Sequence, residues 1–242
     1  MDYAEHVDAL DREITSFAAA VGAPPPEAPV PTCPEFDLAG LTSHVGDLLA
    51  FWSHVLAEAT GTAKPPIADA PDDDAERQAW LVDLGAPVVA ALRAAGPDTP
   101  AWTWYPPNQT FGFWARRAAH ELAVHRVDAQ LAGGTATPID AALARDGIDE
   151  ALTFAALRWN GDAVAAPCTI HLHGTDLDDA EWLLRLDADG IVVEQVHAKG
   201  DLALRGLVSD LELALYARPA AGELQRFGDE AALTTFQRAF TF

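Results

Sequence analysis

The chain has 242 residues, half of them apolar, which is enough for one large domain or two small ones with a buried core. Its formal net charge is −22 at pH 7, from 15 basic and 37 acidic residues. A field of this sign repels phosphate backbones, so nucleic acid is not expected as a partner. No uninterrupted apolar run approaches the roughly 20 residues that span a bilayer, so a membrane partner is not expected either.

The cysteine content indicates a reducing compartment. Only Cys33 and Cys168 occur, and they lie far apart in the sequence. Two thiols in a chain of this length do not form a disulfide framework. The acidic N-terminus also lacks the basic and apolar regions of a secretory signal. We therefore expect a cytoplasmic protein.

The first half of the chain has the apolar spacing of amphipathic helices. The predicted helices cover residues 3–21, 38–60, 75–95 and 113–128, and a further one covers 139–159. Asp37 is the expected N-cap of the second, and a Gly/Pro/Asp loop over 61–74 follows it. The first four helices, joined by moderate loops, predict a four-helix bundle in a first domain of residues 1–160.

The helix over 113–128 carries the chemistry. Glu121 and His125 are four residues apart, so they lie about 40° apart on the helix and can converge on one point. A carboxylate and an imidazole are both zinc ligands, although the same spacing also describes a surface ion pair. Asp128, one turn further along, is either a carboxylate that orients His125 or a surface acid.

A third ligand candidate comes from another helix. His44 lies on or beside the apolar stripe of the helix over 38–60, and facing helices of a bundle can bring distant side chains to one metal. Three protein ligands with an open fourth position are the pattern of catalytic zinc. The sequence thus predicts a site of His44, Glu121 and His125.

Other candidates have simpler interpretations. His171 and His173 share one face of a predicted strand and could bind metal, but a solvent-facing strand position is the interpretation that we favour. Cys33 is either a reactive thiol or ligand, or a small buried residue that anchors its proline-rich loop. Arg116 and Arg117 are expected to neutralise neighbouring acids.

Residues 161–242 have a different character and predict a smaller α+β domain. Strands are expected over 168–174, 182–186, 191–196 and 201–205. Ser209 and Asp229 are the expected caps of two closing helices. The predicted fold class is therefore α+β, a helical bundle followed by this domain.

Three segments together resemble a known family. They are Pro31-Thr32-Cys33-Pro34 with Leu41-Thr42-Ser43-His44-Val45-Gly46, then the Ala119–Ala129 run AHELAVHRVDA, and finally Asp201–Gly206 with Ser209-Asp210-Leu211. They are similar to segments of the actinobacterial, mycothiol-dependent maleylpyruvate isomerase family. That resemblance implies a DinB-like metal-binding bundle and a C-terminal domain similar to sterol-carrier folds. Glu35-Phe36 departs from the Gly-Trp pair that is common there.

The resemblance also implies a site and a reaction. The ligands of zinc, or of another divalent metal, would be His44, Glu121 and His125, and mycothiol would be the thiol cofactor. Its thiolate would add to the cis double bond of maleylpyruvate, and rotation and elimination would give fumarylpyruvate. Arg205 is the nearest match to an arginine that handles the anionic substrate.

Two functions are consistent with these features. The first is a zinc- and mycothiol-dependent isomerase or thiol transferase acting on a small anionic substrate as a monomer or weak homodimer. The second is a DinB-like protein that binds metal without turnover, as a stress or regulatory module. Arginines near the metal would favour the enzyme, and a centre sealed by apolar side chains would favour the binding module.

Overall fold

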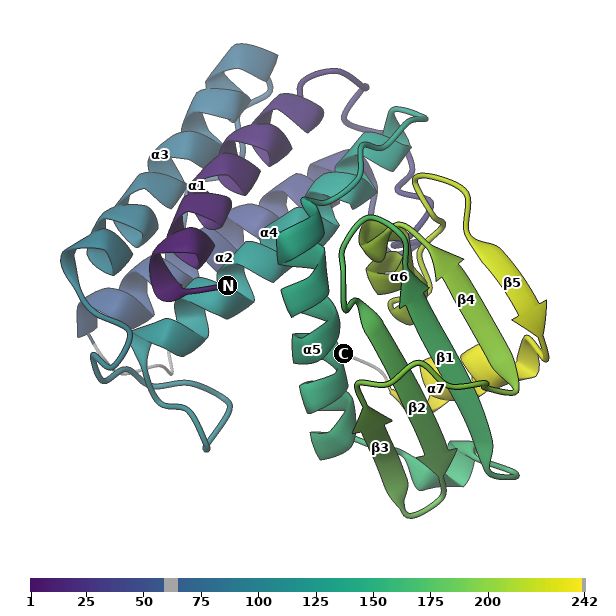
Figure 1. Ribbon diagram of the computed structural model, residues 1–242. Coiled ribbons are helices and arrows are strands. Elements are labelled where there is room, and N and C mark those ends of the chain that lie inside the picture. The colour runs from purple at the N-terminus through teal and green to yellow at the C-terminus, as the bar shows by residue number, and fades with distance from the viewer. Residues whose placement is uncertain (59–64, 241–242) are drawn as a thin grey trace. The chain divides into compact units, whose positions relative to one another are not determined.

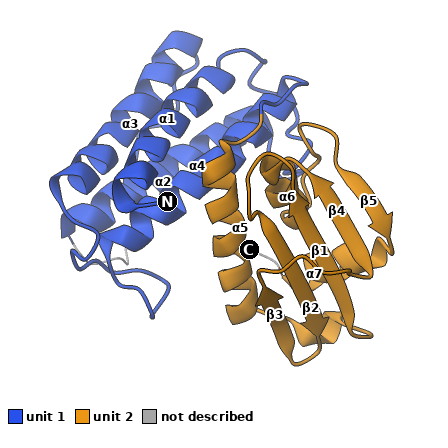
Figure 2. Ribbon diagram, in the orientation of Figure 1, with its two compact units in different colours: residues 1–137 blue, residues 138–242 orange. Residues whose placement is uncertain are grey.

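The computed structural model describes residues 1–58 and 65–240. Its contacts divide the chain into two compact units, residues 1–137 and 138–242 (Figure 2). Unit 1 is helical, and unit 2 is a sheet with helices, so the predicted α+β class is confirmed. No helix in the described ranges is both long and apolar enough to cross a membrane.

Unit 1 is built from helices that each pack on two others (Figure 1). They are α1 (Tyr3–Ala20), α2 (Leu38–Glu58), α3 (Asp74–Ala94) and α4 (Phe111–Ala132). Asp2 and Glu5 form a capping box that starts α1, and Asp37 accepts from the Gly40 amide at the start of α2, as predicted. The last two residues of the predicted second helix, 59 and 60, and 61–64 of the predicted loop lie outside the described residues.

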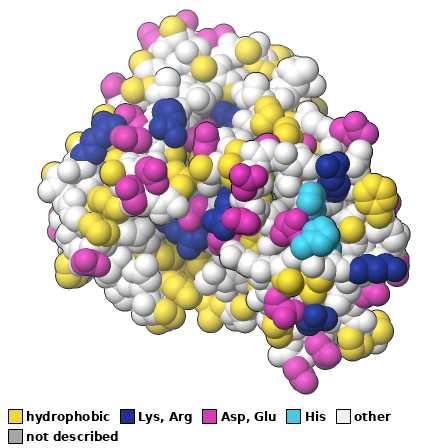
Figure 3. All heavy atoms as spheres, viewed as in Figure 1, with side chains coloured by type: hydrophobic (Ala, Val, Ile, Leu, Met, Phe, Trp, Pro, Cys, Tyr) yellow, Lys and Arg dark blue, Asp and Glu magenta, His cyan; other side chains and the backbone are white. Residues whose placement is uncertain are grey.

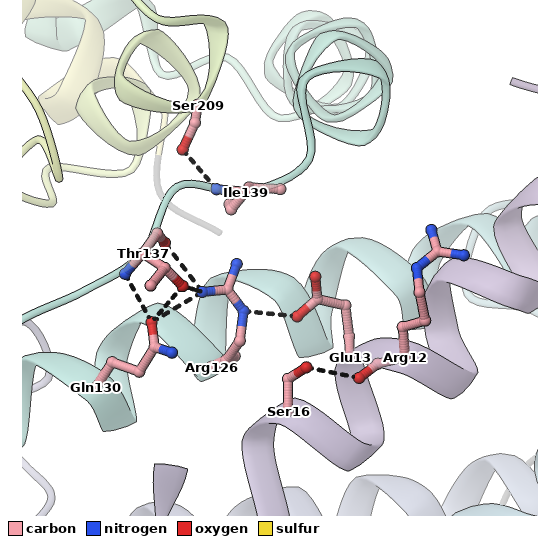
Figure 4. Close-up of polar contacts among 8 residues, drawn as sticks. All are labelled: Arg12, Glu13, Ser16, Arg126, Gln130, Thr137, Ile139 and Ser209. Atoms are coloured by element: carbon pink, nitrogen blue, oxygen red, sulfur yellow. Dashed lines mark hydrogen bonds and ion pairs between the residues drawn. The ribbon is translucent and has the colours of Figure 1, made fainter. Parts of the chain in front are cut away.

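A buried polar network ties α1 to α4 (Figure 4). The Arg126 guanidinium donates to the Glu13 carboxylate at 2.7 Å, to the Gln130 side chain at 2.8 Å and to the Thr137 carbonyl at 2.9 Å. Arg126 and Glu13 are both buried. The network fixes the rotation of α4 against α1, and with it the direction in which the other face of α4 points.

The proline-rich loop before α2 is folded back on itself. Pro29 and Asp37 form an antiparallel bridge, and the Phe36 amide donates to the Cys33 carbonyl. Cys33 is buried in this turn. The loop thereby brings Thr32 and Cys33 against α4, close to His125.

Unit 2 contains a sheet in the order β3-β2-β1-β4-β5, with β1 and β4 parallel and the other pairs antiparallel. Its strands are β1 (Cys168–Gly174), β2 (Glu181–Asp187), β3 (Gly190–Glu194), β4 (Leu202–Gly206) and β5 (Gln225–Gly228). Its helices are α5 (Ala141–Leu157), α6 (Val208–Leu215) and α7 (Ala231–Ala239), with a short 3-10 turn at Gly161–Ala163.

Successive side chains of β1 point to opposite faces of the sheet. Ile170 and Leu172 are fully buried on the face that carries the helices, where Trp182 of β2 donates its indole N–H to Asp149 of α5. His171 and His173 therefore lie on the opposite face. Arg205 of β4 pairs with His173 and shares that face.

The division of the chain differs from the boundary expected at residue 160. α5 belongs to unit 2 because its apolar side packs against α6 and β3. An amphipathic pattern shows that a helix has a buried face but not which element covers it.

Two predictions of helix caps need correction, and one strand was missed. Ser209 does not cap α6, because that helix begins after Leu207 without a side-chain cap. The Ser209 hydroxyl instead accepts a hydrogen bond from the Ile139 amide (Figure 4). β5 was not predicted, because its residues are all exposed and show no alternation. Asp229 is not the N-cap of α7, which begins after Glu230 without a side-chain cap, although the Asp229 carboxylate accepts from the Ala231 amide.

Candidate metal site

The three predicted ligands converge in unit 1. His44 comes from α2, and Glu121 and His125 from successive turns of α4. Their donor atoms all lie within 4.8 Å of one another. Nε2 of His125 is 3.3 Å from Glu121 Oε1, and the rings of His44 and His125 are 5.2 Å apart and nearly perpendicular.

This donor set fits a zinc ion. Two imidazoles and a carboxylate from three side chains are the ligand set of many catalytic zinc sites, which keep a fourth position for a water or another ligand. The three side chains differ in burial: His125 is buried, while His44 and Glu121 are only half-buried. The ion would thus be held from the protein interior and remain reachable from one side.

Charges around Glu121 keep it ionised. Burial disfavours the carboxylate, but the ion pair with Arg117 and the hydrogen bond with His125 outweigh it and hold the pKa of Glu121 well below its usual value. Arg117 is itself buried, one turn before Glu121 on α4. An ionised carboxylate is the form that binds metal.

His125 lies between two carboxylates. Burial alone would lower its pKa, but hydrogen bonds to Asp128 and Glu121 prevail and raise the pKa of His125 to about 9 in the metal-free protein. A metal ion must therefore displace a proton from Nε2 when it binds.

Asp128 is fully buried and contacts the other nitrogen of His125. Its Oδ2 lies 3.0 Å from Nδ1, and the Thr32 hydroxyl donates to Oδ1 at 2.6 Å. The Cys33 thiol donates to Oδ2 over 3.5 Å. Of the two interpretations of Asp128, the structure therefore excludes a surface acid. Cys33 is a small buried residue in its loop, although Cys33, His125 and Asp128 also form a group with metal-ligating side chains.

Phe36 contacts the third ligand. Its ring stacks on the His44 imidazole with centroids 5.4 Å apart and planes inclined by 28°. The Glu35-Phe36 pair at which the sequence departs from the family pattern thus places an aromatic ring against a candidate metal ligand.

Arg205 lies in unit 2 on the exposed end of β4, where its guanidinium donates to the Gln225 side chain at 3.2 Å. Its role with an anionic substrate stays a prediction.

The sequence predicts the three candidate donors but only part of what surrounds them. Arg117 was expected to neutralise a neighbouring acid, and it does so in its ion pair with Glu121, at the i,i+4 spacing that favours such pairs. The hydrogen bond of Thr32 with Asp128 is not predicted. No local pattern signals it, because 96 residues separate the two.

Comparisons with known proteins identify a family and a similar fold. Residues 7–130 match the family model of the mycothiol maleylpyruvate isomerase N-terminal domain. Curated proteins gave no match. The fold is similar to the crystal structure of the mycothiol-dependent maleylpyruvate isomerase, with a TM-score of 0.58, 13% identity and 93% of each chain covered. A histidine-to-alanine mutant of that enzyme matches with a TM-score of 0.57, 12% identity and the same coverage. Since the family model covers just over half of the chain, and includes His44, Glu121 and His125, the protein belongs to the mycothiol maleylpyruvate isomerase family.

Proposed function

We propose that the protein is a zinc- and mycothiol-dependent enzyme, an isomerase of the maleylpyruvate type or a thiol transferase on a small anionic substrate. The observation that carries this proposal is the convergence of His44, Glu121 and His125 within 4.8 Å in a chain of this family. Zinc held there would lower the pKa of a coordinated thiol, so that mycothiol is available as its thiolate near neutral pH.

The side chains of unit 1 have distinct tasks in this proposal. His44, Glu121 and His125 hold the ion, with His125 using Nε2. Asp128 accepts the Nδ1 proton of His125, which fixes the tautomer and ring orientation that ligation requires. Arg117 neutralises Glu121 and limits the negative charge that an anionic substrate meets.

The reaction follows from a thiolate and an activated cis double bond. Bound mycothiol would supply a thiolate that adds reversibly to one alkene carbon, so that the substrate could rotate about the resulting single bond. Elimination of the same thiolate would restore the alkene in its trans form, with no net consumption of thiol or redox equivalents.

One feature favours the enzyme over a metal-binding module without turnover. A buried arginine, Arg117, touches a candidate ligand, whereas a purely structural centre needs only apolar closure. The strongly acidic chain would otherwise repel a diacid.

Metal content tests the ligand set. We expect His125→Ala to lose about one zinc per chain relative to the unmodified protein, because a site with two remaining ligands binds weakly. His54→Ala, a histidine of α2 outside the donor set, is the control and keeps its zinc. Equal zinc content in the unmodified protein and His125→Ala would contradict the site.

Turnover tests the reaction. The zinc-loaded protein is expected to isomerise maleylpyruvate only when mycothiol is supplied, as followed by absorbance of the trans product. Isomerisation at the uncatalysed rate with zinc and thiol both present would exclude the isomerase. A panel of electrophiles, with loss of free thiol as the readout, then tests the transferase.

A further inference from the structure

Unit 2 carries a second cluster of metal-ligating side chains, independent of the site in unit 1. His171 and His173 lie on β1, Glu181 on β2, and His197 in the segment between β3 and β4. One donor atom from each of the four lies within 4.8 Å of the others. Together with His44 and His125 of unit 1, these residues include most of the eight histidines in the chain.

The sheet itself sets the spacing of three of these residues. His171 and His173 are two positions apart on one strand and point to the same face. His173 pairs directly with Glu181 across the antiparallel β1–β2 ladder, and the two side chains are therefore neighbours on that face. A rigid scaffold thus holds two imidazoles and a carboxylate together before any ligand arrives.

A glycine allows the fourth residue to reach the cluster. A Cβ built on Gly200 would lie 2.8 Å from the His171 backbone nitrogen and 2.7 Å from the Leu202 carbonyl oxygen. Only glycine fits that close approach, so the segment before it can run directly against β1. The approach places His197, whose side chain is 77% exposed, over the strand residues.

All three imidazoles meet the same carboxylate. His171 Nε2 and His197 Nδ1 lie 3.2 and 2.7 Å from Glu181 Oε2, and His173 Nδ1 lies 2.9 Å from Oε1. The ring centroids are 5.2 to 6.0 Å apart, and each pair of planes is inclined by at least 69°. Rings so arranged surround one point instead of stacking on one another.

This arrangement fits a divalent transition metal. Bonds of about 2.0 to 2.1 Å in a tetrahedral site place donor atoms about 3.3 Å apart, a spacing that small side-chain rotations reach from the observed one. Imidazole and carboxylate donors suit zinc and its neighbours, whereas calcium and magnesium prefer oxygen ligands alone. The strongly negative chain attracts cations.

The cluster is also accessible. Figure 3 shows histidine side chains gathered at the surface of unit 2 with acidic side chains beside them. A cavity of about 540 Å³ opens next to the cluster and is lined in part by His173, Glu181 and Arg205. A metal ion therefore has an entry path that requires no opening of the core.

We propose that His171, His173, Glu181 and His197 bind one zinc ion, or a similar divalent transition metal, as a structural site that fastens the 195–200 segment to the sheet. Four protein ligands close the coordination shell of zinc, which is the pattern of structural sites. The proposal does not depend on the function proposed for unit 1.

Proteolytic cleavage after Lys199 can be used to detect metal binding at this site. Lys199 is exposed two residues after His197, and the only other lysine, Lys64, precedes Pro65, a bond that lysine-specific proteases cut poorly. We expect zinc at 100 times its dissociation constant to slow cleavage after Lys199 by up to about 100-fold. The reason is that the 195–200 segment opens to the protease only in the metal-free fraction of the protein, which is then about 1%. In His197→Ala, added zinc changes the rate little, and His54→Ala behaves as the unmodified protein.

Zinc content gives a second readout. We expect about two ions per chain, of which His197→Ala and His44→Ala each lose about one, since each lacks a ligand of a different site. His173→Asn, also partly exposed, repeats the test with a strand residue and shows whether a loss is specific to one substitution. Unchanged zinc content in both His197→Ala and His173→Asn, or cleavage at Lys199 at equal rates with and without zinc, would overturn the second site. Loss of zinc in His44→Ala alone would leave the unit 1 proposal standing and exclude this one.

Discussion

At the scale of single residues, the two nitrogens of His125 have different partners. Its Nε2 atom lies next to Glu121 and near His44, whereas its Nδ1 atom contacts the buried Asp128 carboxylate. The contact with Asp128 selects the tautomer that leaves Nε2 free to bind metal, and the Thr32 hydroxyl holds Asp128 in turn.

Asp128→Asn tests this orienting contact. The amide keeps the size of the side chain but loses the negative charge that accepts from Nδ1, so zinc affinity is expected to fall about 10- to 100-fold. Competition with a chromophoric chelator measures the affinity. Asp47→Asn, at an exposed position of α2, is the control and leaves it unchanged. An affinity equal to that of the unmodified protein would show that Asp128 does not orient His125.

The raised pKa of His125 predicts a pH dependence of the zinc-free protein. A group whose pKa is higher in the folded state stabilises that state fully below its unfolded value, about 6.5, and loses this contribution as the pH rises through about 9. Urea unfolding of the zinc-free protein should therefore show a loss on the order of 3 kcal/mol between pH 6.5 and 9.5. In His125→Asn the loss disappears. Zinc affinity should rise over the same range, because fewer protons must be displaced.

At the scale of secondary-structure elements, one face of α4 packs on α1 and another carries the candidate metal ligands. Arg126 faces α1 and its buried carboxylate Glu13 (Figure 4). Glu121 and His125 instead face His44 of α2. Because one rigid helix carries both sets, the packing of α4 on α1 fixes the position of the metal ligands.

Arg126→Leu tests how strongly that packing depends on the network. Removal of the guanidinium leaves the Glu13 carboxylate buried without its main partner, which is expected to cost about 3 to 5 kcal/mol of unfolding free energy. Adding Glu13→Gln should recover part of that loss, since the uncompensated charge is then gone. Arg12→Leu, at the exposed neighbouring position of α1, should change stability by no more than about 0.5 kcal/mol. Denaturant unfolding measures all three, and an equal effect of Arg126→Leu and Arg12→Leu would show that the network contributes little.

At the scale of the whole molecule, the two units carry different donor sets. Unit 1 has a group of three candidate ligands, and unit 2 has a group of four on a sheet face. The arginine that the family resemblance assigns to the substrate, Arg205, lies in unit 2, on the strand next to His173. Activity should therefore be measured on the full chain and not on either unit alone.

Arg205→Gln tests the contribution of unit 2 to turnover. If Arg205 pairs with an anionic substrate, its loss should raise KM about tenfold or more, as expected for a lost charge-assisted hydrogen bond, and leave the zinc content unchanged. Arg185→Gln, an exposed arginine on β2 that pairs with Glu194, is the matched control. Equal KM values for the two variants would remove Arg205 from the substrate site.

Much of the fold and of the candidate site could be predicted, because local rules govern it. Helical spacing located α1 to α5 to within a few residues, and alternation located β1 to β4. Glu121 and His125 share a helix face by geometry alone. β5 escaped prediction because a short exposed strand owes its existence to pairing with β4 and not to its own pattern.

The sequence alone suffices for the α+β class, the resemblance to the family and the choice of candidate donors in unit 1, since each depends on local periodicity or on motif residues. Tertiary structure decided which elements each face meets. It assigned α5 to the sheet unit, brought Thr32 to Asp128 and His44 to His125, and turned a histidine pair on a strand into a cluster of four donors. The physical reason is that a spacing of two or four residues fixes a direction in space, whereas contacts between residues far apart in the chain exist only once packing has brought them together.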